Sequence, residues 1–233
     1  MTEKEKYIGV FDSGIGGLTV VKSIVETMPN ENIIYFGDTA HVPYGTRSKE
    51  QIIEYVLSDV KFLSRFNIKA IVIACNTADS AARDKIEEKY SSIPVYGVVA
   101  PASKKAAELS KNKKIGVIAT NATVNSGAYK KTIYSFDPSA QVISLACPLL
   151  VPLVEEGRFK KGDQVIEEVL HEYLTPLKEQ GIDTLVLGCT HYPLLYDIIT
   201  EIMGDGVTVI SSSVAAAEEL KKITKMKYQK LLL

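Results

Sequence analysis

The 233-residue sequence contains no apolar run long enough to cross a bilayer. Its longest apolar stretch, residues 145–154, is interrupted by Pro148 and Pro152, whereas a membrane-spanning helix needs about 20 apolar residues. The amino terminus, residues 1–6, is polar and charged and lacks the apolar core of a secretory signal. The sequence therefore indicates neither a membrane span nor a secretory leader.

Net charge and cysteine are also scarce. The chain has 27 Lys and Arg residues against 28 Asp and Glu, a formal net charge of −1, and no basic block of the kind that neutralises nucleic-acid phosphates. Nucleic acid is therefore not expected as the primary ligand. The three cysteines are an odd number without a CxxC pair, which argues against a disulfide framework and favours a reducing, cytoplasmic location.

Hydrophobic residues, in contrast, make up 46% of the chain, enough for a core in one large domain or two small ones. Two short apolar runs, residues 71–74 and 185–188, each lead directly into a cysteine and then polar side chains, at Cys75 and Cys189. Short runs rich in Val, Ile and Leu are typical of buried parallel strands, whose carboxyl ends carry ligands in open α/β sheets. We therefore expect both cysteines at one pocket.

A thiol suits acid–base chemistry because its ordinary pKa, about 8.5, lies close to cytosolic pH. Residues 76–82 are typical of a capped helix, whose dipole is expected to lower the pKa of Cys75 further. A single free cysteine is more often a packing residue. Two at matching strand ends, each followed by hydroxyl or amide side chains, favour function, whereas Cys147 lacks such neighbours and is expected to be structural.

Other polar groups follow other expected strands. The first strand, residues 7–11, runs into Asp12 and a glycine-rich turn that opens a helix, so a carboxylate is expected at the sheet edge of the cysteines. A loop at residues 37–45 follows the second strand and is long enough to wall a pocket, although its composition fits a surface loop equally well. The next helix is expected over residues 48–66, with an inner face of Ile52, Ile53, Val56, Leu57, Val60 and Leu63.

The second half of the sequence echoes the first. Gly9 and Gly116 stand in similar strands 107 positions apart, and Cys75 and Cys189 are 114 positions apart. Residue identity between the halves is low, but the shared strand order and cysteine placement favour an internal repeat. The expected fold class is α/β, with two similar doubly wound parallel-sheet domains related by pseudo-twofold symmetry and the active site in the cleft between them.

Two thiols that face each other across a cleft meet the requirement for inverting a carbon centre, which is to remove a proton from one face and deliver one to the other. Asp12 would assist Cys75, while His191, oriented by Glu155, would assist Cys189. Hydroxyls and amides suited to the carboxylates of an acidic substrate stand at Ser13, Asn76, Thr77 and Thr190.

Three other functions would use subsets of these residues. A cysteine-dependent hydrolase or transferase would combine Cys189 as nucleophile, His191 as base and Glu155 as orienter, which leaves Cys75 without a role. A zinc site would combine both cysteines with His191, but no fourth ligand stands at a recognisable spacing. A non-catalytic amino-acid-binding module would need the polar contacts but not two thiols.

Five motifs together closely resemble the glutamate racemases, a branch of the aspartate/glutamate racemase family: residues 11–17, 37–45, 74–78, 152–157 and 188–193. The resemblance covers nearly the whole chain. It implies an isomerase that interconverts L- and D-glutamate without a cofactor or metal and supplies D-glutamate for bacterial peptidoglycan, and hence for cell-wall biogenesis and cell shape. Aspartate racemisation is the alternative within the family.

By this resemblance Cys75 deprotonates D-glutamate and Cys189 deprotonates L-glutamate, with assistance from Asp12, Glu155 and His191. Substrate contacts are implied at Asp12, Ser13, Tyr44, Gly45, Asn76, Thr77, Thr123, Thr190 and His191. The partners expected are the small-molecule substrate and a second copy in a homodimer, with no membrane partner.

The resemblance also implies a first domain of residues 1–97 plus 208–233 and a second of residues 98–207. Family members usually continue some tens of residues past the helix expected at residues 214–223. We therefore expect a chain that is less stable, and more prone to associate near Leu231-Leu232-Leu233, than a version extended by that segment.

Overall fold

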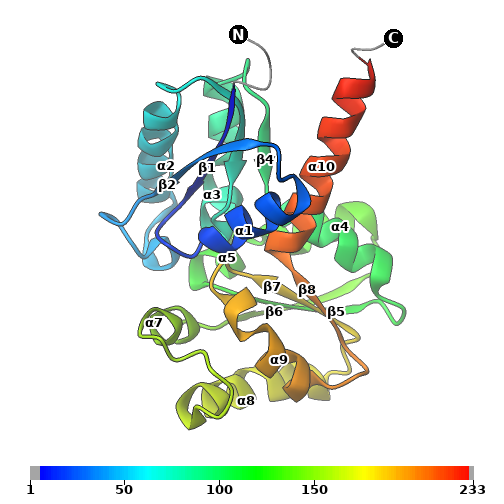
Figure 1. Cartoon of the computed structure of the whole chain (residues 1–233). Coiled ribbons are helices and arrows are strands. Elements are labelled where there is room, and N and C mark those ends of the chain that lie inside the picture. The colour runs from blue at the N-terminus through cyan, green and yellow to red at the C-terminus, as the bar shows by residue number, and fades with distance from the viewer. Residues whose placement is uncertain (1–5, 231–233) are drawn as a thin grey trace.

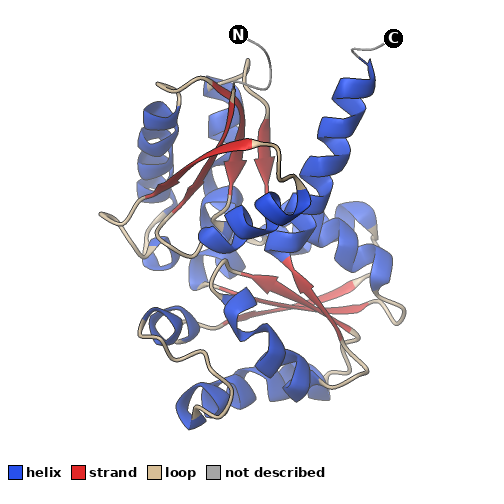
Figure 2. Cartoon of the chain, in the orientation of Figure 1, coloured by secondary structure: helices blue, strands red, loops and turns tan. Residues whose placement is uncertain are grey.

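Two parallel four-stranded sheets, each flanked by helices, make up the computed structural model, which describes residues 6–230 (Figure 1, Figure 2). The first sheet has the order β2-β1-β3-β4 and consists of β1 (Tyr7–Asp12), β2 (Asn32–Gly37), β3 (Ile68–Ile73) and β4 (Val95–Gly97). The second has the order β6-β5-β7-β8 and consists of β5 (Lys114–Ala119), β6 (Gln141–Ala146), β7 (Thr184–Gly188) and β8 (Thr208–Ser211). The predicted fold class is confirmed.

The helices connect and cover these strands. In the first half they are α1 (Leu18–Thr27), η2 (Tyr44–Thr46), α2 (Lys49–Leu63), α3 (Asn76–Lys89) and α4 (Val99–Leu109). In the second half they are α5 (Asn121–Ser126), α6 (Ala128–Phe136), α7 (Leu150–Glu155), α8 (Gln164–Glu179), η3 (Tyr192–Leu195), α9 (Tyr196–Met203) and α10 (Ser212–Lys230). No helix in residues 6–230 is long and apolar enough to cross a membrane.

The strand registers reproduce the internal repeat. Gly9 of β1 lies opposite Ile71 of β3, and Gly116 of β5 lies opposite Leu185 of β7. Ile71 and Leu185 are 114 positions apart, the same spacing as the two cysteines that follow β3 and β7. Both cysteines therefore directly follow strands that hold the same position in two sheets of equivalent strand order.

The core explains why the strands read as continuous apolar runs. Both faces of each sheet are covered, so successive side chains of one strand enter different clusters. Val10 of β1 joins a central cluster shared with Val186 of β7 and Leu220 of α10, whereas Phe11 packs on the other side with α2 and α3. The central cluster includes residues of α1, α4, α6 and α10, so the two sheets are joined through apolar contacts between helices.

Several element boundaries differ from those predicted. Residues 48–66 contain a shorter helix, α2, because Ser48 and Gln51 form a capping box at its start and the helix ends at Leu63. The predicted boundary at residue 208 assigns β8 to the first domain, and in the structure β8 pairs with β7 of the second sheet. The terminal Leu231-Leu232-Leu233, and the expectation that rests on it, lies outside the described residues.

Candidate active site

A cavity of about 300 Å³ lies at the carboxyl ends of the strands and is lined by both halves of the chain. Ten of the twelve residues predicted from the sequence line it: Ser13, Tyr44, Gly45, Cys75, Asn76, Thr77, Glu155, Cys189, Thr190 and His191. The other two, Asp12 and Thr123, are buried behind this lining. Strand ends of parallel sheets are the usual place for such a site.

Cys75 occupies the N-cap position of α3, just after β3, and is only 6% exposed. Its Sγ accepts a hydrogen bond from the backbone N–H of Ala78 at 3.5 Å and lies 3.6 Å from Ser13 Oγ. Burial and, to a lesser extent, the charge of Asp12 together raise the pKa of Cys75 to about 12, although these hydrogen bonds oppose the shift. The expectation of a lowered pKa is therefore wrong, because loss of water outweighs the helix terminus.

Cys189 follows β7 and belongs to a short chain of polar groups. Its Sγ lies 3.8 Å from His191 Nδ1, and His191 Nε2 lies 3.0 Å from Glu155 Oε1 at the end of α7. Burial raises the pKa of Cys189 well above that of an ordinary thiol, and a backbone hydrogen bond from His191 opposes the shift. The expected grouping of the three side chains is therefore present in the structure.

Asp12 is fully buried and is held from both halves of the chain. Its Oδ1 accepts the backbone N–H of Gly14 at 3.0 Å, and Thr190 Oγ1 donates to its Oδ2 at 3.3 Å. Burial raises the pKa of Asp12, whereas the nearby imidazole of His191 lowers it. The carboxylate thus lies between the two thiol environments.

Glycines allow the two halves to approach at this site. A Cβ on Gly16 would lie 2.5 Å from Thr190 Oγ1, and one on Gly45 would lie 2.8 Å from Thr120 Cβ. Neither distance is compatible with a side chain unless the opposite residue moves. The glycine-rich turn after β1 and the loop before α2 therefore form close contacts with the second half.

The predicted amide and hydroxyl groups are largely engaged with one another. Tyr129 donates its hydroxyl to Asn76 Oδ1 at 2.6 Å. Thr77 Oγ1 lies 2.9 Å from Thr120 Oγ1 and 3.1 Å from Thr123 Oγ1. Thr123 therefore contacts another side chain of the site and does not line the cavity itself.

Comparison with known proteins bears on this geometry. A model of the family described as Asp/Glu/hydantoin racemase matches residues 8–220.

The chain belongs to this family.

Among its relatives, the glutamate racemase of Neisseria meningitidis is 49% identical over 220 residues, which cover 94% of this chain and 80% of the relative. The glutamate racemase of Corynebacterium kroppenstedtii is 48% identical, with 97% and 76% covered. A crystal structure of a glutamate racemase from Bacillus anthracis superposes with a TM-score of 0.93 at 43% identity, covering 97% of this chain and 84% of that one. The protein is therefore an enzyme, an isomerase of the racemase class.

The cavity is also lined by residues that were not among the predicted site residues. These are Val42, Pro43, Thr46, Thr120, Asn121, Cys147, Pro148, Val151, Pro152 and Glu156. Thr120 stands 107 positions after Ser13, the spacing of Gly9 and Gly116, so the internal repeat held the signal that would have found it. Cys147 is fully buried and borders the cavity, and burial raises its pKa to about 12.

The charges around this racemase cavity are unevenly distributed. Its described lining includes Glu155, Glu156 and His191 but no Lys or Arg. Within residues 6–230, no three His, Cys, Asp or Glu side chains lie close enough together to hold a metal ion.

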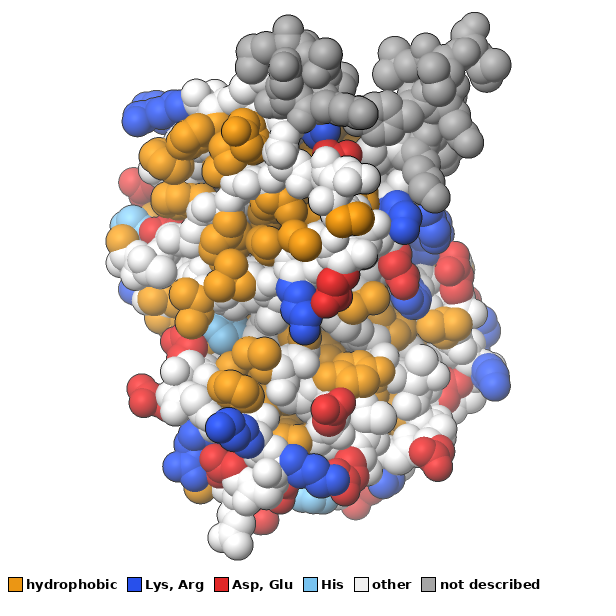
Figure 3. All heavy atoms as spheres, viewed as in Figure 1, with side chains coloured by type: hydrophobic (Ala, Val, Ile, Leu, Met, Phe, Trp, Pro, Cys, Tyr) orange, Lys and Arg blue, Asp and Glu red, His pale blue; other side chains and the backbone are white. Residues whose placement is uncertain are grey.

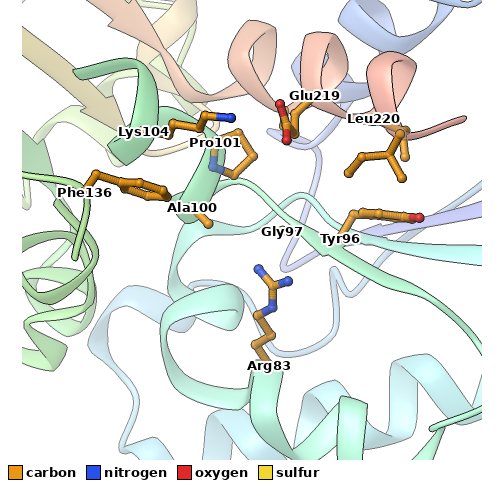
Figure 4. A pocket seen from close by; sticks show the side chains of 11 residues that line it. Arg83, Tyr96, Gly97, Ala100, Pro101, Lys104, Phe136, Glu219 and Leu220 are labelled. Carbon is orange, nitrogen blue, oxygen red and sulfur yellow. The ribbon is translucent and has the colours of Figure 1, made fainter. Parts of the chain in front are cut away.

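A second cavity, of about 170 Å³, lies where α3, β4, α4, α6 and α10 meet (Figure 4). Arg83, Tyr96, Lys104 and Phe136 border it, and Arg83 Nε donates to Glu87 at 2.8 Å. None of the predicted site residues reaches this second cavity.

Proposed function

We propose that this racemase interconverts L- and D-glutamate without a cofactor, by proton transfer between the substrate Cα and the two thiols of Cys75 and Cys189. The observation that carries the proposal is that both thiols come from equivalent strand ends and border one cavity. Relatives support the choice of substrate. The solved racemase from Francisella tularensis is in complex with D-glutamate, and the one from Escherichia coli is in complex with L-glutamate.

The lining supports binding of an amino dicarboxylate. Hydroxyl and amide donors of Ser13, Asn76 and Thr77 are suited to the two carboxylates, together with the backbone N–H groups at the start of α3. The hydroxyl of Thr190 also lines the cavity, but its hydrogen is donated to Asp12. The described lining has no Lys or Arg that could supply a positive charge. The ammonium group of the bound substrate would therefore be the source of positive charge beside the thiols. That charge stabilises a thiolate and so opposes the effect of burial on thiol pKa.

In the proposed reaction from D-glutamate, the thiolate of Cys75 removes the Cα proton and the thiol of Cys189 donates a proton to the opposite face. From L-glutamate the two thiols exchange roles. A thiolate whose conjugate acid has a raised pKa is a stronger base than an ordinary cysteine thiolate, which favours abstraction of a weakly acidic proton. Asp12 would assist Cys75, and His191, held by Glu155, would assist Cys189.

The test is incubation with either enantiomer of glutamate in deuterated water with excess chelator. Racemisation predicts decay of optical activity together with one solvent deuterium at Cα and no other change in mass. Cleavage products would support the hydrolase instead, and tight binding without decay would support a binding module. Parallel incubation with aspartate distinguishes the two racemases of the family, and loss of activity in chelator would reveal a required metal.

We further infer that the product serves peptidoglycan synthesis in the cytoplasm. Three free cysteines, two of them with proposed catalytic roles, require a reducing compartment to stay active. Deletion of the gene should then make growth depend on added D-glutamate.

We also propose that each subunit consists of two domains. The first domain comprises residues 1–97 plus the carboxyl-terminal helix α10, and the second domain contains the second sheet, including β8.

We propose further that two subunits form a homodimer. Apolar side chains gather on the face of the first half that Figure 3 shows, and Ile15, Leu18 and Val25 are 58%, 51% and 49% exposed. A cluster of exposed apolar side chains favours association with another protein surface. Sedimentation of the wild type and of Leu18→Glu tests the dimer, since a monomer in both would contradict it.

A further inference from the structure

The hydroxyl of Tyr44 lies between two buried carboxyl groups outside the set of proposed catalytic residues. It is 2.6 Å from Asp38 Oδ2 and 2.9 Å from Asp59 Oδ2. Tyr44 is 1% exposed, Asp38 5% and Asp59 4%. On the far side of Asp38, His41 Nδ1 lies 2.8 Å from both carboxylate oxygens, and its ring stacks on Tyr55 of α2.

These contacts require a proton beyond the one that the phenol supplies. Tyr44 has a single O–H hydrogen, so it can donate to only one of the two carboxyl oxygens. If both carboxyl groups were ionised, one would face a lone pair of the phenol oxygen without a hydrogen between them. A proton on Asp59 completes the chain: Asp59 donates to Tyr44, Tyr44 donates to Asp38, and His41 donates to Asp38.

The shorter contact identifies Asp38 as the ionised partner, because hydrogen bonds to charged acceptors are the shorter ones. Asp59 lies on the buried face of α2 beside Val56 and Val60, where an isolated carboxylate is costly. The titratable groups that act on it are Tyr44, Asp38 and His41.

We propose that Asp59 is a positioning residue that keeps its proton in mildly acidic solution and thereby fixes Tyr44 and the loop of residues 38–46 against the active-site cavity. Val42, Pro43, Tyr44, Gly45 and Thr46 of this loop all line the cavity. Gly45 also lies close to Thr120 of the second half, so the loop links α2 to the opposite wall of the cavity. The consequence for catalysis rests on the proposed racemase function, whereas the proton on Asp59 does not.

The electrostatic environment agrees with this geometry. Burial and the charge of Asp38 raise the pKa of Asp59, Tyr44 and His41 lower it, and the outcome is a pKa of about 7. Because the folded-state pKa exceeds the ordinary value of 3.8, the folded protein binds this proton more tightly than the unfolded chain does. Its contribution to stability is therefore complete below the ordinary pKa and is lost as pH rises to about 7, where the loop also loses its fixed position.

Three variants test the proposal. Asp59→Asn keeps a neutral side chain with hydrogen-bond donors, Asp59→Ala removes the contact, and Glu54→Gln removes an exposed carboxylate from the same helix as the matched control. Melting temperature and kcat/KM are measured for each from pH 5 to 9.

The wild type is expected to lose melting temperature as pH rises from 5 to about 7, with no further loss from this group above that pH, and to lose kcat/KM as pH rises through about 7. Glu54→Gln should behave identically. Asp59→Asn should lack this step in both profiles while keeping kcat/KM at pH 6.5 within about threefold of the wild type. Asp59→Ala should lose about tenfold or more in kcat/KM, mainly through KM, since one hydrogen bond of about 1.4 kcal/mol corresponds to a factor of 10.

An Asp59→Asn variant with the wild-type pH dependence in both profiles would overturn the proposal, as would an Asp59→Ala variant as active as the wild type. If the variants fail to fold, a ¹³C NMR titration of the wild type decides the matter: an Asp59 carboxyl carbon that titrates below pH 5 refutes the shared proton, and one that titrates near pH 7 supports it. The melting and NMR measurements need no substrate. A wild type that does not racemise glutamate would therefore refute the proposed function without deciding the state of Asp59.

Discussion

Replacing one thiol at a time separates the two halves of the proposed reaction. Cys75→Ala and Cys189→Ala each remove one proton-transfer group and leave the other in place. Each side chain is 6% exposed, so the loss is of one buried sulfur atom. By analogy with the removal of a single buried methyl group, the cost is about 0.5–1.5 kcal/mol, against a total stability of about 5–15 kcal/mol. Both variants should therefore fold.

Racemisation should fall by at least about a thousandfold in either variant, because general acid–base groups contribute about 10²–10⁴ and inversion needs both faces of Cα. One-sided proton exchange should survive. Cys75→Ala retains the thiol proposed to deprotonate L-glutamate, so it should exchange the Cα proton of L-glutamate with solvent without inverting it. Cys189→Ala should do the same with D-glutamate only.

The assay is proton NMR in deuterated water, which measures loss of the Cα signal, combined with circular dichroism, which measures inversion. Cys147→Ala is the matched control, because it removes the same atom from another buried thiol at the cavity edge. It should keep racemase activity within a few fold. The reasoning is refuted if either catalytic-thiol variant still racemises substantially, or if Cys75→Ala exchanges D-glutamate instead of L-glutamate.

Three further predictions concern the groups around the thiols. His191→Ala should lower kcat more from L-glutamate than from D-glutamate, and Asp12→Asn should show the opposite bias. The KM values should shift so that the equilibrium constant stays fixed. Equal losses of kcat in both directions for both variants, measured by polarimetry, would contradict the pairing of assistants with thiols. Glu155→Gln should weaken activity by only about tenfold, because one hydrogen bond to His191 is worth about 1–2 kcal/mol and the carboxylate is partly exposed, and a loss as large as that of His191→Ala in the same assay would argue for a direct role. In the enzyme without substrate, Cys75 has a pKa of about 12, so iodoacetamide should alkylate it about a thousand times more slowly at pH 8 than a thiol of pKa 9. The alkylation rate should still be rising at pH 10, and mass spectrometry of the peptide that contains Cys75 measures it.

Much of the fold could be predicted because burial on both faces makes parallel strands into short apolar runs. The runs that precede Cys75 and Cys189 coincide with β3 and β7. The pairing of β8 with β7 was not predicted because it is decided by tertiary contacts, and residues 208–211 alone carry no sign of which sheet they join. The same limit applies to β6, which was not recognised in the apolar stretch around residue 145.

The composition of the site was more predictable than its energetics. Family motifs pointed to Asp12, Glu155 and His191, and in the structure His191 contacts Cys189, Glu155 contacts His191, and Asp12 accepts a hydrogen bond from Thr190. The direction of the Cys75 pKa was not predictable, because a local sequence reveals the helix that follows but not the amount of water that tertiary packing removes. Asp59 was missed for a related reason: in a predicted amphipathic helix, an acidic residue is assigned to the solvent face unless its partner is known.

The identical strand order of the two sheets bears on the handedness of the substrate. The enantiomers of an amino acid have equal free energies in water, so a racemase must reach equal kcat/KM values from either hand. That equality holds for any site, but it leaves the separate kcat and KM values from each hand free, and a site of L-residues without internal symmetry has no reason to make them alike. Here β3 and β7 hold the same place in two sheets of one design, and each leads to a thiol. Exchanging the hand of the substrate then corresponds to exchanging the two halves, so a chiral chain comes close to an achiral response at one carbon atom.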